Sequence, residues 1–374
     1  MKIIVLIFSV FILVSCYPFK KQPVVSLTPR ELELAQARGI DGEDLARWQA
    51  LPLNKLTPLE LDRYLGFIHE FIPNLRQRVQ YLARKNLGQP YQIYLLGEFP
   101  FEIYDEQPLF CLEKSDCVVF SEHTYAMALA QNWREFFIIL QRIRYKNGII
   151  GMLTRNHYTE LDWDKNNNWL VEDITDSIAS QFAKRDTVII DKRKFFKRFN
   201  IGQELLADTL ELSYIPAEYV KDVLQFLQPG DFVNIVRGPE NSKDGDKYVG
   251  HVGLITRKSD GTVCFLHSTW PQVMEQPLTS VYFPYDEYNG RRKAENDEIR
   301  QYNEGIRKKY AGNEQQIKKK IKAVKPLFYG FKFLRLRENP LGTLKSLENE
   351  NDSLLIRSGV AWPESITINP ETEK

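Results

Sequence analysis

Cys117 is the residue whose type and position most favour chemistry. It follows Ser115-Asp116 and opens a run to Ala130 without proline or glycine, which predicts a helix that begins at the cysteine. A sulfur at a helix N-terminus lies near the positive end of the helix dipole and near unpaired amide protons, and both favour the nucleophilic thiolate. A buried structural cysteine is the alternative, so the sequence favours catalysis only if it also supplies a base.

His251 and His267 are the best candidates for that base. They lie at the ends of two strand-like runs, 251–256 and 262–267, which a turn containing Ser259-Asp260-Gly261 joins. With a connecting loop of three or five residues centred on position 259, His251 faces His267 and the two Cβ atoms are about 5 Å apart. This geometry predicts that His251 accepts the thiol proton and that His267 holds the tautomer and orientation of His251.

Zinc is a competing use of these three side chains, since cysteine and histidine are among its usual ligands. The sequence offers neither a fourth ligand beside them nor a Cys-x-x-Cys pair. We therefore expect no metal and no other cofactor in the site.

The elements that must position these residues follow a simple order along the chain. Thr28-Pro29-Arg30-Glu31 and Thr57-Pro58-Leu59-Glu60 each place a capping threonine before a proline, with glutamate at the third helical position, which predicts two helix starts. Further helices are expected from about 74 to 87 and from Trp133 to Arg144. Strand-like runs lie at 231–236, 251–256, 262–267 and 331–336. Helices first and consecutive strands afterwards predict an α+β fold with an antiparallel sheet.

Motifs around the candidate residues resemble a known family. After the cysteine come Pro229-Gly230-Asp231, Gly250-His251-Val252-Gly253 and Leu266-His267-Ser268, an order that resembles the NlpC/P60 superfamily of papain-like cell-wall hydrolases. From about residue 75 to 336 the chain is more specifically similar to the DUF1460 branch, whose members are N-acetylmuramoyl-L-alanine amidases. The motifs that carry this likeness are Leu87-Gly88-Gln89-Pro90-Tyr91, Ser115-Asp116-Cys117-Val118-Val119-Phe120-Ser121-Glu122, Ile143-Arg144-Tyr145, Thr154-Arg155-Asn156-His157-Tyr158 and Asp162-Trp163.

The resemblance implies a papain-like fold in which the nucleophile lies at the N-terminus of a helix packed on an antiparallel sheet. It also implies a thiol acyl-enzyme mechanism that cleaves the amide bond between N-acetylmuramic acid and L-alanine, with Cys117, His251 and His267 as catalytic residues. A D-glutamyl endopeptidase on the same fold and a non-catalytic peptidoglycan-binding lipoprotein are the alternatives. In each case the expected partner is peptidoglycan or its muropeptide fragments.

The resemblance further implies roles for three residues around the nucleophile. Tyr91 lies beside Cys117, where its hydroxyl can help the Cys117 amide to stabilise an oxyanion. Arg155 and His157 lie near the groove, and an arginine there suits the α-carboxylate of D-glutamate in the stem peptide. The alternative is that Arg155 and His157 only hold a loop in place.

The first sixteen residues predict export and lipidation. Lys2 precedes an apolar run from Ile3 to Val14, which is too short to span a bilayer and is typical of a signal peptide, here 1–15. Leu13-Val14-Ser15-Cys16 has the lipobox pattern, in which the cysteine receives a diacylglycerol. We expect a lipoprotein of the bacterial cell envelope, anchored to a membrane through Cys16 and facing the periplasm or the cell exterior. An ordinary secretory signal is the alternative.

Composition narrows the partners further. With 50 basic and 49 acidic residues, the chain has no excess charge that would attract nucleic acid. The three cysteines other than Cys16 are too few for a disulfide framework, which favours free thiols. The predicted organisation is a tether at 16–27, a helical extension at 28–74, a catalytic domain at 75–338 with an ordinary amphipathic surface helix at 313–325, and a disordered tail at 339–374.

Overall fold

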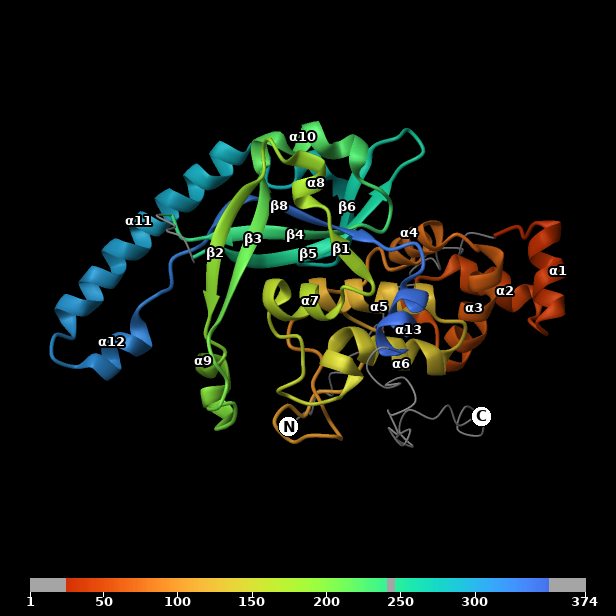
Figure 1. Cartoon of the computed structure of the whole chain (residues 1–374), viewed down its shortest axis with the longest axis horizontal. Coiled ribbons are helices and arrows are strands. Elements are labelled where there is room, and N and C mark those ends of the chain that lie inside the picture. Colours follow the sequence, from red (N-terminus) through yellow and green to blue (C-terminus); the bar gives the residue numbers. More distant parts are fainter. Residues whose placement is uncertain (1–24, 241–245, 350–374) are drawn as a thin grey trace, which may run out of the picture.

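The computed structural model describes residues 25–240 and 246–349 (Figure 1). The predicted signal peptide, the lipidation site Cys16 and most of the predicted tether lie outside the described residues. Among the helices that are described, none is both long and apolar enough to cross a membrane.

The N-terminal part of the chain is helical. Thr28 and Thr57 each close a capping box with the glutamate three residues later, so both predicted helix starts are confirmed. Asn74 and Asn132 cap the next two predicted helices, because their side chains accept hydrogen bonds from backbone N–H groups of the first turn. The helices are α1 (Pro29–Ala37), α2 (Gly42–Ala50), α3 (Pro58–Phe71), α4 (Leu75–Lys85), α5 (Cys117–Leu129) and α6 (Trp133–Arg144).

An eight-stranded antiparallel sheet follows within the described residues. Its strand order is β2-β3-β8-β4-β5-β6-β7, and β1 pairs with β8 at the side. The α+β fold and all four predicted strands are therefore confirmed. The strands are β1 (Val171–Asp173), β2 (Lys184–Ile190), β3 (Asp208–Pro216), β4 (Phe232–Gly238), β5 (Tyr248–Arg257), β6 (Val263–Ser268), β7 (Val273–Pro277) and β8 (Leu327–Leu336).

Strand β2 is an element that the sequence patterns do not reveal. It lies at the edge of the sheet and pairs only with β3, so it buries one face and exposes the other. Its buried positions include Asp186, which pairs with Lys247 at 3.0 Å. A buried acidic residue in an edge strand breaks the alternation of apolar and polar residues on which strand prediction depends.

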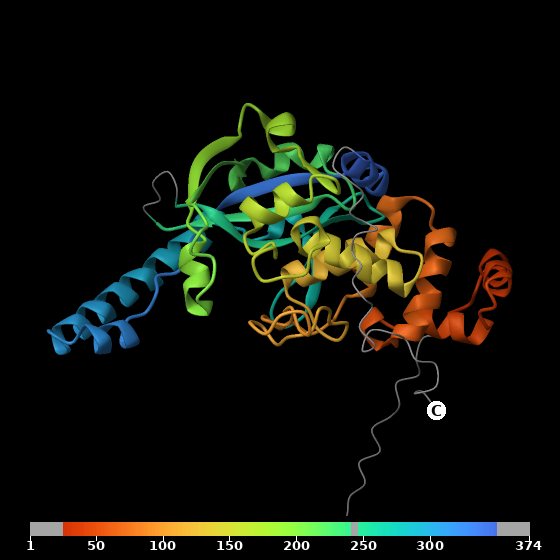
Figure 2. The ribbon, with the colours of Figure 1, turned by 60° about the horizontal axis from the view of Figure 1, so that its bottom comes forward.

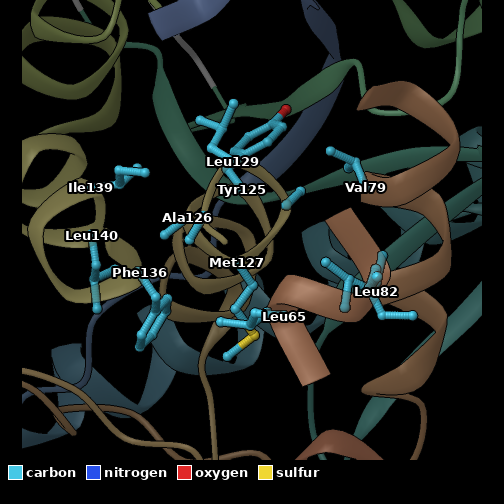
Figure 3. Packing of buried hydrophobic residues seen from close by; sticks show 14 of the residues in the cluster. Leu65, Val79, Leu82, Tyr125, Ala126, Met127, Leu129, Phe136, Ile139 and Leu140 are labelled. Carbon is cyan, nitrogen blue, oxygen red and sulfur yellow. The ribbon is translucent and has the colours of Figure 1, made fainter. Parts of the chain in front are cut away.

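Helix α5, which carries the candidate nucleophile, lies in the centre of the protein. Every residue from Val119 to Leu129 is buried, which is the pattern of a helix enclosed on all sides. Figure 3 shows its side chains between Val79 and Leu82 of α4 and Phe136 and Leu140 of α6. The sheet covers another side, since residues of β4, β5, β6 and β8 belong to the same apolar cluster. The helix start is thus held rigidly against the sheet.

A second layer of short helices covers the opposite face of the sheet. Figures 1 and 2 show α8 and α10 on one side of the strands and α5, α6 and α7 on the other. Ile255 of β5, Phe265 of β6 and Phe331 of β8 belong to the apolar cluster of this second layer. The helices of this second layer are α8 (Thr175–Ala179) and α10 (Val220–Val223); two further short helices, α7 (Asp164–Asn166) and α9 (Arg193–Phe196), do not belong to it.

An arm formed by α11 (Tyr285–Lys309) and α12 (Glu314–Lys320) projects from the body (Figure 1). Asn289, Asn296 and Asn303, seven residues apart on α11, each donate to one backbone carbonyl and accept from the N–H of the same residue on the returning chain. The residues held in this way are Phe328, Lys325 and Lys322. The surface helix predicted for 313–325 therefore ends at Lys320, because the asparagines bind the backbone groups that further helical turns would use.

The predicted disordered tail is also corrected in its first part. Residues Pro340–Asn349 form helix α13, and Asn339 precedes it with a side chain that accepts from Gly342 N at 3.0 Å. Leu344 is 1% exposed and packs into the same apolar cluster as α5, so burial offsets the entropy cost of ordering this turn. The remainder of the predicted tail lies outside the described residues.

Candidate active site

The start of α5 fixes the position of Cys117. Asp116 is the N-cap, and one of its carboxylate oxygens accepts from Val118 N at 3.0 Å and Val119 N at 2.8 Å. Ser115 ties this cap to the sheet, because its hydroxyl lies 3.0 Å from that of Ser268, which in turn donates to the Ser115 carbonyl. Ser268 directly follows His267 in β6. The helix start and the end of β6 are therefore held together at the candidate site.

The two predicted histidines are in contact. His251 Nε2 lies 2.6 Å from His267 Nδ1, a hydrogen bond between the two rings. Phe265, which is fully buried, stacks on His267 with ring centroids 4.4 Å apart and meets His251 edge-on at 6.0 Å. The predicted contact between the two histidines is thus present, and the ring of Phe265 restricts the rotation of both imidazoles.

The predicted strand register, however, is wrong, because the turn is centred one residue later than predicted. The hairpin is centred on Asp260, because the Asp260 side chain accepts from Thr262 N at 2.9 Å and Gly261 adopts φ +86°. Continuing the observed pairing of Leu254 with Leu266 places Gly253 opposite His267. The two histidines therefore meet diagonally.

Glycine at position 253 makes that diagonal contact possible. A Cβ at Gly253 would lie 2.8 Å from the Cβ of His267 and 2.6 Å from the ring of Phe265. Compared with the predicted register, each residue pairs with a partner an even number of residues away, and such partners point to the same face of a strand. Both histidines therefore still lie on one face of the sheet.

Cys117 approaches this pair through the backbone of β5. The N–H of Val252, the residue after His251, lies close enough to the thiol to favour the thiolate, and the N–H groups of Val118 and Cys117 act in the same direction. Among the described residues, no hydrogen bond joins the Cys117 thiol to His251. Hydrogen bonds between catalytic groups commonly shorten only when substrate binds. In the free protein, the backbone of β5 holds the thiol near His251 without a hydrogen bond between them.

Burial determines the charge state of the candidate catalytic groups. It raises the pKa of Cys117 to about 12, with the negative charge of Asp116 as the next cause. Burial likewise lowers the pKa of His251 well below its usual range, with His267 and Arg237 contributing, and lowers that of His267 to about 4. The helix start favours the thiolate as predicted, but burial outweighs it. In the free protein at neutral pH the thiol and both imidazoles are therefore neutral.

Tyr91 lies within electrostatic range of the candidate nucleophile. Burial raises its pKa, and the nearby Cys117 and Asp116 raise it further. The segment that carries Tyr91 is fixed, because Tyr91 N donates to Pro271 O at 2.9 Å and Ser115 N donates to Pro90 O at 3.1 Å. The expected role of Tyr91 in binding an oxyanion stays a prediction.

Arg237, near the end of β4, is a residue that sequence reasoning misses. Its charge acts on both His251 and Tyr91, and its guanidinium hydrogen-bonds to the hydroxyl of Tyr282. In the sequence it follows an apolar run and has the character of an ordinary exposed strand-end charge. Only the fold, which lays its side chain across Gly250, brings this cation to the site.

A cavity of about 270 Å³ opens beside the start of α5 and is lined by both predicted substrate residues, Arg155 and His157. Arg155 Nη1 already binds Asp105 at 3.2 Å and Glu98 at 3.4 Å. The ring of His157 donates from Nε2 to the carbonyl oxygen of Met152 at 2.8 Å, and burial lowers the pKa of His157 to about 3. Both residues therefore hold the cavity wall, and their contact with substrate stays a prediction.

Arg198 is a further cation on the wall of this cavity. Its guanidinium lies 4.4 Å from the ring of Phe195 and 4.6 Å from that of Phe199, and no carboxylate among the described residues pairs with it. By contrast Arg144, another lining residue, is bound to Glu122 at 3.1 Å. Arg198 ends the basic run Lys192-Arg193-Lys194-Phe195-Phe196-Lys197-Arg198, which has the composition of a solvated surface. It lines the cavity because the segment between β2 and β3 folds next to it.

No metal-binding cluster is evident at this site. Within the ranges that the structure describes, no three histidine, cysteine, aspartate or glutamate side chains gather as a metal site would require.

The fold and the site define an amidase-like α+β protein: a central helix that begins with a cysteine, packed on an antiparallel sheet that carries a histidine pair. The chain belongs to the N-acetylmuramoyl-L-alanine amidase-like family, whose model matches residues 81–283, just over half of the chain. The likeness to DUF1460 stated from the motifs is thereby confirmed at the level of the family.

Two solved structures are similar to parts of the chain. A Legionella pneumophila protein assigned to DUF1460 is similar over 74% of this chain and 95% of its own, with 18% identity and a TM-score of 0.54. An N-acetylmuramoyl-L-alanine amidase from Bacteroides uniformis covers 70% of this chain and 99% of its own length, with 19% identity and a TM-score of 0.46. No curated protein sequence matches the chain. At 18% identity the likeness to the Legionella protein shows the fold alone.

Proposed function

We propose that this protein is a cysteine amidase that cleaves the amide bond between N-acetylmuramic acid and L-alanine in peptidoglycan. The observation that carries the proposal is the 2.6 Å contact between His251 and His267 beside the helix start that holds Cys117. A half-buried thiol alone does not indicate catalysis, but this thiol lies by the backbone of Val252, the residue after an oriented histidine, and together they have the parts of an acyl-transfer site. Membership of the amidase-like family supports the choice of substrate.

The first half of the reaction transfers the muramoyl acyl group to sulfur. His251 takes the proton from the Cys117 thiol as the sulfur attacks the lactyl carbonyl carbon, and the carbonyl electron pair moves to oxygen. The Cys117 amide and the Tyr91 hydroxyl stabilise that oxyanion. When the C–N bond breaks, His251 returns the proton to the amine of L-alanine, which leaves with the stem peptide.

Water completes the cycle. It attacks the thioester and gives one proton to His251, after which the carbon–sulfur bond breaks and the thiolate recovers that proton. Because both partners start neutral, each proton transfer is coupled to bond formation, so no thiolate accumulates in the resting protein.

The cavity beside α5 is the place for the stem peptide in this proposal. The stem carries free carboxylates, and a guanidinium binds a carboxylate with paired hydrogen bonds. Arg155 is already engaged by Asp105 and Glu98, whereas Arg198 is free of such partners among the described residues. We therefore assign carboxylate binding to Arg198 and wall support to Arg155.

The finer classification follows from the same resemblance. We place the chain in the NlpC/P60 superfamily with a papain-like arrangement of its site, and we place the mature protein in the cell envelope as a lipoprotein anchored by Cys16. The lipobox pattern at Leu13-Val14-Ser15-Cys16 and the short apolar run before it support the anchor.

The products of a defined muropeptide test the proposal. With N-acetylmuramoyl-tripeptide as substrate, mass analysis should find N-acetylmuramic acid and the intact tripeptide. A D-glutamyl endopeptidase would instead leave N-acetylmuramoyl-dipeptide and release the third amino acid. Binding without any new product would mean that the protein is a peptidoglycan-binding lipoprotein without catalysis.

A further inference from the structure

The histidine pair continues into a third side chain on the neighbouring strand. His267 Nε2 lies 3.2 Å from the side-chain amide of Gln276, which is half-buried on β7. Phe265, the residue whose ring supports both imidazoles, is the register partner of Gln276. The chain of contacts therefore runs from His251 through His267 to Gln276, each link between two polar atoms.

The positions of the protons in this series of hydrogen bonds follow from one rule: each hydrogen bond needs one donor and one acceptor. A neutral imidazole carries one N–H and one lone pair, whereas an amide offers an NH2 donor at one end and a carbonyl acceptor at the other. The end that Gln276 presents to His267 therefore sets the tautomer of His267, and His267 in turn sets the tautomer of His251.

Only one of the two arrangements leaves His251 able to act as a base. If the Gln276 NH2 faces His267, as in the structure, His267 must donate from Nδ1 to His251 Nε2, and the His251 proton then lies on Nδ1. Nδ1 is the only His251 nitrogen left for the thiol, so it would have no lone pair to offer. If the carbonyl faces His267 instead, both rings carry their protons on Nε2 and His251 Nδ1 is free.

We propose that Gln276 is a positioning residue that sets the catalytic tautomer of His251 through His267, with its carbonyl oxygen toward His267 in the active state. This inference rests on the proposed function of the site. The two ends of an amide have nearly the same shape, and neither amide atom of Gln276 makes another hydrogen bond among the described residues. A half-turn of the amide therefore interconverts the competent and incompetent arrangements at little steric cost.

Nitrogen NMR of the imidazoles tests the proposal without relying on turnover. In uniformly 15N-labelled full-length protein, long-range 15N–1H spectra should assign the neutral form of both His251 and His267 to the Nε2–H tautomer. In Gln276→Met, which keeps the length and removes the amide, a second tautomer should appear for His267. A His267 that carries its proton on Nδ1 in the unaltered protein would overturn the proposal.

Kinetics separate positioning from packing. Gln276→Met should lower kcat by at least about 10-fold with KM unchanged, a part of the roughly 100- to 10,000-fold that a general base contributes. Gln276→Glu presents only acceptors, so it should keep the rate and move the acid limb of kcat/KM upward, because its charge favours protonated histidine against the opposing effect of Arg237. Equal loss in both variants would mean a packing role and would contradict the inference.

The two proposals fail in different ways. If the unaltered protein forms no product, the proposed function fails, while the tautomer assignment still decides the role of Gln276. If product forms normally in Gln276→Met and its pH profile is unchanged, the inference fails and the proposed function stands.

Discussion

At the scale of single residues, the proposed nucleophile and the proposed base are both neutral in the free protein. Burial raises the pKa of the Cys117 thiol and lowers that of the His251 imidazole, so neither group ionises alone near neutral pH. Besides burial, His267 and the cation Arg237 lower the pKa of His251. In the proposed mechanism, activation of Cys117 therefore needs one proton transfer to His251.

The pH dependence of the reaction follows from these shifts. A base works only while unprotonated, and His251 has its pKa below the usual 6.5, so the acid limb of kcat/KM should lie below pH 6.5. Arg237→Met removes one of the causes and should move that limb upward, whereas Arg237→Lys keeps the charge and should leave it in place. An acid limb unmoved in Arg237→Met would show that Arg237 does not act on the base.

Substrate affinity tests the assignment of Arg198. Arg198→Ala should raise KM by roughly 10-fold or more and leave kcat nearly unchanged, since a hydrogen bond to a charged group is worth about 1.5–3 kcal/mol. Lys194→Ala, at an exposed position in the same basic run, is the matched control and should match the parent. If KM does not rise in Arg198→Ala, the carboxylate is bound elsewhere, with Arg155 the next candidate.

At the scale of helices and strands, the sequence predicted the features that depend on interactions between residues close together in the chain. Capping boxes at Thr28 and Thr57 and the helix start at Cys117 depend on residues within one turn, and all three are present. The histidine register depended on where the turn is centred, which Asp260 and Gly261 decide through one side-chain hydrogen bond and one positive φ. The pairing of the histidines was predictable, but its diagonal geometry was not.

Contacts between distant segments account for what the sequence could not reveal. Arg198 and Gln276 lie near the site only because β2–β3 and β7 fold next to it. The basic run 192–198 is visible in the sequence but has the composition of a solvated surface, and no local pattern marks Gln276. The end of α12 at Lys320 has the same cause, since the asparagines of α11 compete for the backbone groups of residues 322 and 325. Tertiary hydrogen bonds of this kind override the helix propensity of a segment.

The asparagine ladder gives a prediction for the arm. Asn296 is fully buried, and Asn296→Ala removes two hydrogen bonds to Lys325, each worth about 0.5–1.5 kcal/mol. Hydrogen exchange should accelerate in residues 321–326, while the unfolding temperature of the body stays nearly the same. Glu298→Ala, an exposed change on the same helix, should leave exchange unaltered. Equal exchange in both variants would mean that the ladder does not hold the returning chain.

At the scale of the whole molecule, the site lies between two dissimilar ends. Helix α1 lies at one end of the long axis and the α11–α12 arm at the other, with α5 and the sheet between them (Figure 1). The described chain begins just before α1, so the proposed anchor on Cys16 would join the body at the α1 end.

Cell fractionation tests the anchor independently of catalysis. The parent protein should be recovered with membranes, and Cys16→Ala or treatment with globomycin should move it to the soluble fraction or leave it unprocessed. Cys111→Ala changes a cysteine outside the lipobox and should not alter its distribution. A Cys16→Ala protein that remains processed and membrane-bound would require a different attachment.

Nucleophile trapping tests whether Cys117 forms a thioester with the muramoyl group. With N-acetylmuramoyl-tripeptide and added hydroxylamine, the parent enzyme should yield the hydroxamate of N-acetylmuramic acid together with free tripeptide, because hydroxylamine competes with water for the acyl-enzyme. Folded Cys117→Ala protein should yield neither. Hydrolysis that continues in Cys117→Ala, or a parent reaction that releases tripeptide without any hydroxamate at high hydroxylamine, would contradict the account.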